Sequence, residues 1–165
     1  MEEYHPGEPF AENLLPPAPA PDLANAAWRD YGNRAGGFRL VEALAGAGHR
    51  PAVLLNTDAY ATAPGLIAAA RAAGAEFVGH GTANSRSLAA MSDAEERACL
   101  AEVSAAIARE EGAPPGGWSS PWLAQREGTV ANLARAGYRY LLDLRLDDQP
   151  AWLRSGAARL LAIPY

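Results

Sequence analysis

The sequence predicts an α/β fold in which short parallel strands alternate with amphipathic helices. Two observations support this prediction. The chain repeats one unit, in which an amphipathic helix is followed by a glycine and then by a short apolar segment. The glycines stand where a helix needs a residue in the left-handed conformation in order to end. Because strands that alternate with helices pair in parallel, we expect a sheet whose strands end at one common edge.

A proline-rich segment precedes these repeats. Residues 1–27 are rich in proline and acidic groups, with the run PPAPAP over residues 16–21. Such a run forms neither a helix nor a central strand, so we expect residues 1–27 to be an extended arm. Residues 28–165 then form a single α/β domain, which is long enough to bury a sizeable core.

Local signals set the bounds of the predicted elements. Ser92 and Glu95 form a capping-box pattern that begins the longest helix. Pro64 suits the first turn of its helix, where the missing N–H costs nothing. From these signals we expect helices at residues 38–47, 64–73, 92–111 and 129–136, and strands at residues 51–55, 76–79, 117–118, 138–142 and 159–163.

Composition and charge exclude several classes of function. No apolar run approaches the roughly 20 residues that span a bilayer. The net charge of −5, without a basic block, argues against nucleic acid or an anionic membrane as partner. The single cysteine, Cys99, excludes an intrachain disulfide and is expected to fill space in a helix rather than act as a nucleophile. With no signal-peptide pattern at the start, we expect a cytoplasmic protein.

His80 is the residue around which a functional interpretation can be built. It follows a short apolar strand and precedes a loop of small residues, at the edge where α/β barrels carry catalytic groups. The other predicted strands deliver further polar and aromatic residues to this edge. An imidazole, carboxylates and an aromatic wall together are suited to hydrolysis. The residues expected there are Asn56, Thr57, Asp58, His80, Thr82, Asn84, Trp118, Ser119, Ser120, Pro121, Trp122, Asp143, Asp147, Asp148 and Gln149.

Each of these residues also has a purely structural interpretation. His80 could be a core histidine whose nitrogens are satisfied by the backbone. Asp147 and Asp148 could be turn residues that solvate a loop, and Asp143 is the better candidate because it directly follows an apolar segment. The large side chains of Trp118 and Trp122 suit a core as well as they suit a pocket wall.

The spacing of possible metal ligands argues against a tight zinc site. A second histidine four residues after His80 would make a good zinc pattern, but Asn84 occupies that position. An amide oxygen is a weak ligand for a transition metal beside imidazole. No cysteine cluster or second nearby histidine compensates, so we expect no tightly bound metal.

Four motifs resemble those of the polysaccharide deacetylase superfamily, which includes the family 4 carbohydrate esterases. They are WRDYGNR at residues 28–34, GHGTANS at 79–85, GWSSPW at 117–122 and DDQP at 147–150. The first is the most specific, and the allantoinase-like branch is the most similar one. The resemblance implies a distorted (β/α) barrel, usually of seven strands, that hydrolyses non-peptide C–N bonds.

The resemblance also implies roles for individual residues. Glu2 and Glu3 match the acidic pair that supplies a base and a metal ligand, and His80 matches the first metal-binding histidine. Asn84 stands where the second histidine would be, and Ser119 replaces an arginine of the third motif. These departures favour a metal-independent mechanism. Pro121 and Trp122 match the proline and aromatic residue of the third motif, and Asp143 lies near the fourth.

The chain is expected to be a shortened version of this domain. It has no apolar strand ahead of Glu2, and it stops at Tyr165 before the family's last histidine motif. A barrel without its first and last strands has open sheet edges, which proteins normally cover. The proline-rich arm or a second subunit, in a homo-oligomer, could cover them.

The sequence therefore predicts a hydrolase of amide, ureide or N-acetyl groups that works by acid–base chemistry on a small-molecule substrate. A weak divalent metal such as zinc would be held by Glu3, His80 and Asn84. The rival hypothesis is a non-catalytic remnant that binds a ligand or dimerises, whereas a nucleotide-binding domain lacks the required glycine-rich loop. The expected catalytic residues are His80, Asp143, Glu2 and Glu3, and the expected substrate-binding residues are Asn84, Trp118, Pro121, Trp122, Asp147 and Asp148.

Overall fold

The computed structural model describes Met1 and residues 22–164. Its centre is a six-stranded sheet with the strand order β1-β2-β3-β4-β6-β5. All neighbouring strands are parallel except β5, which pairs antiparallel with β6. The sheet is not closed, so the fold is an incomplete barrel with β1 at one edge and β5 at the other. The strands are β1 Ala52–Leu55, β2 Glu76–Gly79, β3 Gly117–Trp118, β4 Tyr140–Leu141, β5 Ala151–Ser155 and β6 Ala158–Ala162.

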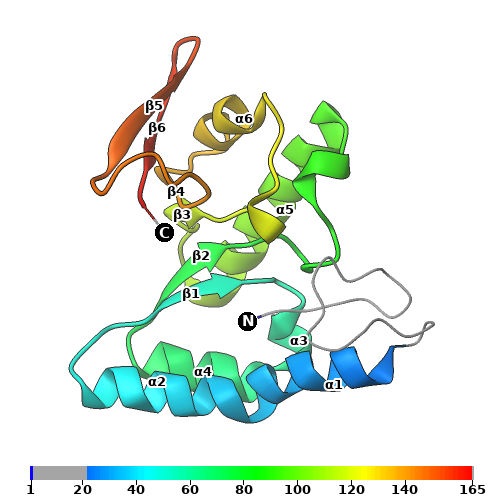
Figure 1. Ribbon diagram of the computed structural model, residues 1–165, viewed down its shortest axis with the longest axis vertical. Coiled ribbons are helices and arrows are strands. Elements are labelled where there is room, and N and C mark those ends of the chain that lie inside the picture. Colours follow the sequence, from blue (N-terminus) through cyan, green and yellow to red (C-terminus); the bar gives the residue numbers. More distant parts are fainter. Residues whose placement is uncertain (2–21, 165) are drawn as a thin grey trace.

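Helices connect β1 to β2, β2 to β3 and β3 to β4, as the repeat predicted, whereas a loop and β5 lie between β4 and β6. Figure 1 shows α2 and α4 near β1, α5 beside β2, and α6 near the β5–β6 hairpin. The π-helix η1 Gly32–Gly36 joins α1 directly to α2, and the short 3-10 helices η2 Leu88–Ala90 and η3 Pro121–Leu123 lie in loops. The α-helices are α1 Leu23–Tyr31, α2 Gly37–Gly46, α3 Ala59–Thr62, α4 Pro64–Ala72, α5 Asp93–Glu111 and α6 Thr129–Arg135.

The local signals read from the sequence act as expected. Ser92 accepts the backbone N–H of Glu95, and the Glu95 side chain accepts the backbone N–H of Ser92, so the capping box that begins α5 is complete. Pro64 lies in the first turn of α4. Gly112 ends α5 with a φ of 81°, in the left-handed region that costs glycine little.

The core lies between the sheet and these helices. Trp118 is fully buried in it and makes an edge-to-face contact with Tyr138, at 5.4 Å between ring centroids. Gly79 allows Trp118 to pack this closely, because a Cβ at position 79 would lie 2.9 Å from its ring. Cys99 is also buried in this core, as the sequence predicted. Burial raises the pKa of its thiol to about 11, which suits a filler and not a nucleophile.

The structure corrects two predictions about the elements. Helix α1 begins at Leu23, inside the range 1–27 that was expected to be an extended arm, because Asp22 caps it by accepting the backbone N–H of Asn25 at 3.1 Å. Residues 2–21 lie outside the described part of the chain. Strand β5 was not predicted; a two-residue turn at Gly156, with a φ of 60°, joins it to β6.

Candidate functional site

The candidate site lies where β1 to β4 end. The loops after these strands are joined by backbone hydrogen bonds, such as those from the Thr57 N–H to the Gly81 carbonyl and from the Ser119 N–H to the Gly79 carbonyl. Parallel strands bring these loops together at one edge, as the sequence predicted. The buried polar residues gathered there are Asn56, Thr57, His80, Thr82, Asn84, Ser119, Ser120 and Asp143.

The His80 imidazole is held in one tautomer. Its Nδ1 lies 2.7 Å from the carbonyl oxygen of Ser119. A carbonyl oxygen can only accept a hydrogen bond, so Nδ1 carries the proton of the neutral ring and Nε2 carries the lone pair. Nε2 is therefore the nitrogen that can take up a proton or bind an electrophile.

Burial decides the charge of this ring. His80 is 7% exposed. Burial lowers the pKa of His80 to about 4, although hydrogen bonds with the Ser119 carbonyl and the Asn84 side chain oppose the change. The ring is therefore neutral at pH 7. A neutral ring with its proton on Nδ1 cannot polarise a carbonyl through Nε2, so this geometry fits a proton acceptor and not an electrophile.

Two asparagines fix the loop that carries His80. Asn56, the first residue after β1, donates through Nδ2 to the His80 carbonyl oxygen and lies 3.5 Å from Oδ1 of Asn84. Asn84 is 3% exposed, and its side chain lies close enough to the imidazole of His80 to raise its pKa. The sequence placed Asn56 at this edge without giving it a role. Its position directly after a strand was the available signal.

Asp143 follows β4, which pairs with β3 on the side opposite to β2, the strand that His80 follows. Its Oδ1 accepts the backbone N–H of Ser120 at 2.7 Å. Within the described part of the chain, its buried Oδ2 has no hydrogen-bond partner. Burial raises the pKa of Asp143, while its hydrogen bonds to Ser120 oppose this change. His80 and Asp143 thus hydrogen-bond to the backbone of consecutive residues, Ser119 and Ser120.

The loop after β3 carries an aromatic residue in an unusual conformation. Trp122 and Leu123 have φ values of 61° and 54°, in the left-handed region that costs a non-glycine residue roughly 1–2 kcal/mol. The Trp122 indole donates from Nε1 to the Asn84 carbonyl oxygen at 2.8 Å, so it joins this loop to the loop that carries His80. Pro121 is buried against Gly81, where a Cβ would lie 3.0 Å from its ring.

The structure does not bring every predicted residue to this edge. Trp118, expected to bind substrate, is fully buried in the core because its ring faces Gly79 and Tyr138. Asp147 and Asp148 are exposed, and Oδ1 of Asp147 accepts the backbone N–H of Gln149, as in an ordinary turn.

Glu2 and Glu3, expected to be catalytic, lie outside the described residues. Met1, which precedes them, lies beside β1. Its amino group donates to the Leu54 carbonyl oxygen at 2.8 Å, and its carbonyl oxygen accepts the Asn56 N–H at 3.2 Å.

An apolar cavity of about 270 Å³ adjoins His80. Helix α2 supplies Leu40 and Leu44 to its wall, and β1 supplies Val53 and Leu54. Such a volume is close to that of the smaller ligand pockets of proteins. It lies beside β1, which is the outer strand of the described sheet, and next to Met1.

The described donor atoms of this site do not by themselves make up the ligand set of a tight zinc ion. Zinc in proteins takes three or four ligands from histidine, cysteine and carboxylates. Within residues 22–164 and Met1, no three such side chains are grouped so as to hold a metal. His80 contributes one imidazole and Asn84 an amide, and the third expected ligand, Glu3, is outside the described residues. We therefore derive no step through a metal.

Solved structures share this fold. Structures assigned as polysaccharide deacetylases from Mycobacterium smegmatis and from Pseudomonas aeruginosa PAO1 match with TM-scores of 0.79 and 0.74, at 24% and 23% sequence identity. They cover 87% and 90% of this chain, and the match spans 50% and 51% of their own length. An allantoinase matches with a TM-score of 0.75 at 25% identity over 87% of this chain and 47% of its own. No family model and no curated sequence matches the chain.

The chain therefore has the fold of the polysaccharide deacetylase superfamily, as its motifs predicted. The structures that share it include deacetylases and an allantoinase, and the chain spans about half their length. None of the described helices is long and apolar enough to cross a membrane.

Proposed function

We propose that this protein hydrolyses a non-peptide C–N bond in an amide, a ureide or an N-acetyl group. The observation that carries the proposal is His80, a neutral imidazole whose Nε2 lone pair is fixed by the bond from Nδ1 to Ser119. It lies at the strand edge of a fold shared with deacetylases and an allantoinase. A neutral imidazole with an oriented lone pair can accept a proton at neutral pH, and a pKa of about 4 makes it a weak base but a strong acid once it is protonated.

The proposed reaction needs one proton carrier and one water molecule. Nε2 of His80 takes a proton from the water, whose oxygen attacks the carbonyl carbon of the substrate. The C–N bond then breaks, and the same nitrogen returns the proton to the leaving nitrogen. Asp143 or an amino-terminal glutamate, Glu2 or Glu3, assists as a second acid–base group, and Trp122 lines the pocket.

The reaction is proposed to run without a tightly bound metal. The argument is the donor set, in which Asn84 replaces a potential imidazole ligand. Weak binding of a divalent ion such as zinc, by Glu3, His80 and Asn84, is the variant of the proposal that chelation tests. A cytoplasmic location belongs to the same proposal.

One observation favours a second candidate, a domain that binds a ligand or a second copy of itself without turnover. His80, Asn84 and Asp143 are only 7%, 3% and 6% exposed. In the described part of the chain, β1 and β5 are the outer strands of the sheet, and a second subunit would pair with an outer strand. A ligand that binds without reacting would raise the melting temperature and leave no product.

The test is hydrolysis of allantoin and of N-acetylglucosamine by the purified protein, before and after chelation, with metal content measured by plasma mass spectrometry. We expect turnover that survives chelation and that His80→Ala reduces at least a hundredfold. His49→Ala is the matched control, because His49 is exposed ahead of β1. Full activity of His80→Ala would overturn the mechanism, and stabilisation without product would favour the binding domain.

A further inference from the structure

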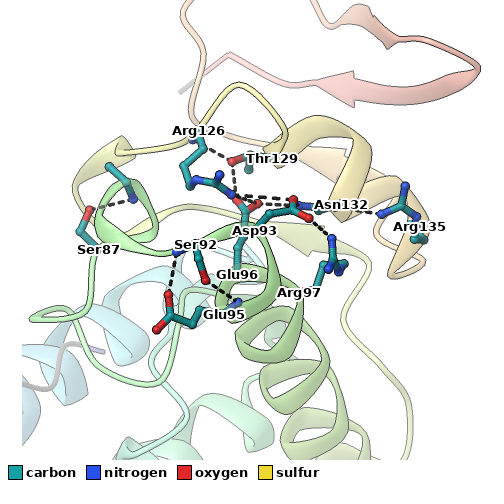
Figure 2. A network of polar contacts seen from close by, with 11 residues as sticks. Ser87, Ser92, Asp93, Glu95, Glu96, Arg97, Arg126, Thr129, Asn132 and Arg135 are labelled. Carbon is teal, nitrogen blue, oxygen red and sulfur yellow. Dashed lines mark hydrogen bonds and ion pairs between the residues drawn. The ribbon is translucent and has the colours of Figure 1, made fainter.

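The carboxylate of Glu96 is completely buried and forms the centre of a polar network. Its Oε2 accepts from Asn132 Nδ2 at 2.6 Å and from Arg126 Nη1 at 3.3 Å, and its Oε1 accepts the hydroxyl of Thr129. Figure 2 shows these side chains converging on Glu96 from the segment ahead of α6 and from α6 itself. The network therefore ties the start of α5 to the chain that follows β3.

The same chain segment carries Trp122. Residues 119–128 connect β3 to α6, and the network holds the carboxyl-terminal end of this loop, at Arg126. Thr129 links the backbone to the network, because its hydroxyl accepts the Arg126 N–H at 2.8 Å and donates to Glu96. The carboxyl-terminal end of the loop is thus fixed through both the backbone N–H and the side chain of Arg126.

The amino-terminal end of this loop, at Ser119 and Ser120, is held by residues of the candidate site. The Ser119 N–H donates to the Gly79 carbonyl at 2.9 Å, and the Ser120 N–H donates to Asp143 at 2.7 Å. Trp122 and Leu123, with their left-handed backbone, lie between the two anchors. Strained residues of this kind persist only where the surrounding structure holds them on both sides.

We infer that Glu96 is a positioning residue, which holds Trp122 in its left-handed conformation and so fixes Asn84 and His80 behind it. The chain of contacts runs from Glu96 through Thr129 and Arg126 to the loop, and then from Trp122 Nε1 to the Asn84 carbonyl at 2.8 Å. The side chain of Asn84 in turn lies close enough to the imidazole of His80 to raise its pKa. The effect on catalysis rests on the proposed function, whereas the effect on Trp122 does not.

The first test follows the indole N–H signals of the 15N-labelled protein by NMR, with Trp122→Phe used to assign the Trp122 signal. In the unmodified protein we expect slow exchange of the Trp122 indole proton with solvent, because Nε1 is hydrogen-bonded to Asn84. Glu96→Gln removes the charge from the network, and Thr129→Val removes the bridging hydroxyl at nearly constant shape. Each should accelerate this exchange at least tenfold.

Two controls separate positioning from general damage. Glu95→Gln makes the same substitution one residue earlier in α5, where glutamine can still complete the capping box, and it should leave the exchange unchanged. The indole of Trp118, which donates to Ser120 within the core, should keep its signal in every variant. If Glu96→Gln fails to fold, Thr129→Val carries the test.

The outcomes are distinct. Unchanged exchange at Trp122 in both network variants would overturn the inference, and so would an equal disturbance of the Trp118 signal, which would indicate a merely structural role. Where the protein hydrolyses allantoin or N-acetylglucosamine, we expect Glu96→Gln to lower kcat about tenfold with little change in KM. If the unmodified protein hydrolyses neither compound, the proposed function loses support, while the exchange result still decides the inference.

Discussion

In the described part of the chain, the carboxylates of Glu96 and Asp143 are buried, and their surroundings differ. Glu96 is 0% exposed and accepts hydrogen bonds through both oxygens, from Arg126, Thr129 and Asn132. Asp143 is 6% exposed, and within the described residues only its Oδ1 is paired, to the backbone of Ser120.

A buried carboxylate whose two oxygens both accept hydrogen bonds is typical of a structural anchor, a group that holds neighbouring segments together. A buried carboxylate with one unpaired oxygen lowers stability and is typical of a binding or catalytic site. The regions around Glu96 and Asp143 differ in the same way, in how fully their polar groups are paired. The junction of α5 and α6 is built from satisfied charges. The candidate site combines a neutral imidazole, an acid with a raised pKa and a strained turn. Stability is thus concentrated at the junction, and chemical reactivity at the strand edge.

The largest expected effect comes from removing the anchor. Glu96→Ala removes the buried acceptor that Arg126, Thr129 and Asn132 share, and leaves Asp93 as the remaining acceptor of Arg126 and Asn132. Breaking a buried charged pair by removing one partner typically costs about 3–5 kcal/mol. We expect a loss of this size in the free energy of unfolding, measured by urea denaturation. A loss below about 1 kcal/mol, the usual worth of an exposed ion pair, would contradict the assignment of Glu96 as an anchor.

The second-largest expected effect is that the free energy of unfolding depends on pH because of His80. The pKa of His80 is about 4 in the folded protein, against about 6.5 for an unperturbed histidine. The unfolded chain therefore binds the proton first as the pH falls. The stability that His80 contributes is fully present above pH 6.5 and is lost progressively down to pH 4. The loss amounts to about 3 kcal/mol, because one pKa unit corresponds to about 1.4 kcal/mol.

This pH dependence is checked by urea denaturation between pH 4 and pH 7. His80→Gln should flatten the curve in that window, since glutamine does not titrate. His49→Gln replaces an exposed histidine outside the site and should leave the curve as it is. If His80→Gln retains the full slope, the imidazole is not the group responsible.

The sequence predicted the elements that depend on local signals. The capping box of Ser92 and Glu95, the proline that begins α4 and the glycine that ends α5 each have a local physical cause and lie where expected. Helix α1 was missed because the neighbouring prolines dominated the prediction, although Asp22 is a good N-cap. Strand β5 was missed although the glycine at position 156 is a hairpin signal.

The site was predicted only in part. His80, Asn84 and Asp143 lie at the expected edge because strand direction alone decides this. The hydrogen bond that selects the His80 tautomer involves a carbonyl 39 residues away, which no local pattern reveals. Glu96 did leave a signal, since it occupies the apolar face of α5 together with Cys99, Leu100 and Val103. A carboxylate on such a face must have partners, but its spacing does not say which.

The smallest effect should come from Asp143, and its sign is opposite to that of Glu96. Burial raises the pKa of Asp143, so folding works against its charged form at neutral pH. Asp143→Asn keeps an oxygen that can accept the Ser120 N–H and removes the buried charge. We expect the free energy of unfolding at pH 7 to rise by up to about 1 kcal/mol, the usual scale of one hydrogen-bonding group. The gain should shrink as the pH falls, because protonation removes the same charge in the unmodified protein. A loss of stability at pH 7 comparable to that of Glu96→Ala would mean that Asp143 is a second anchor and that the contrast between the two carboxylates is wrong.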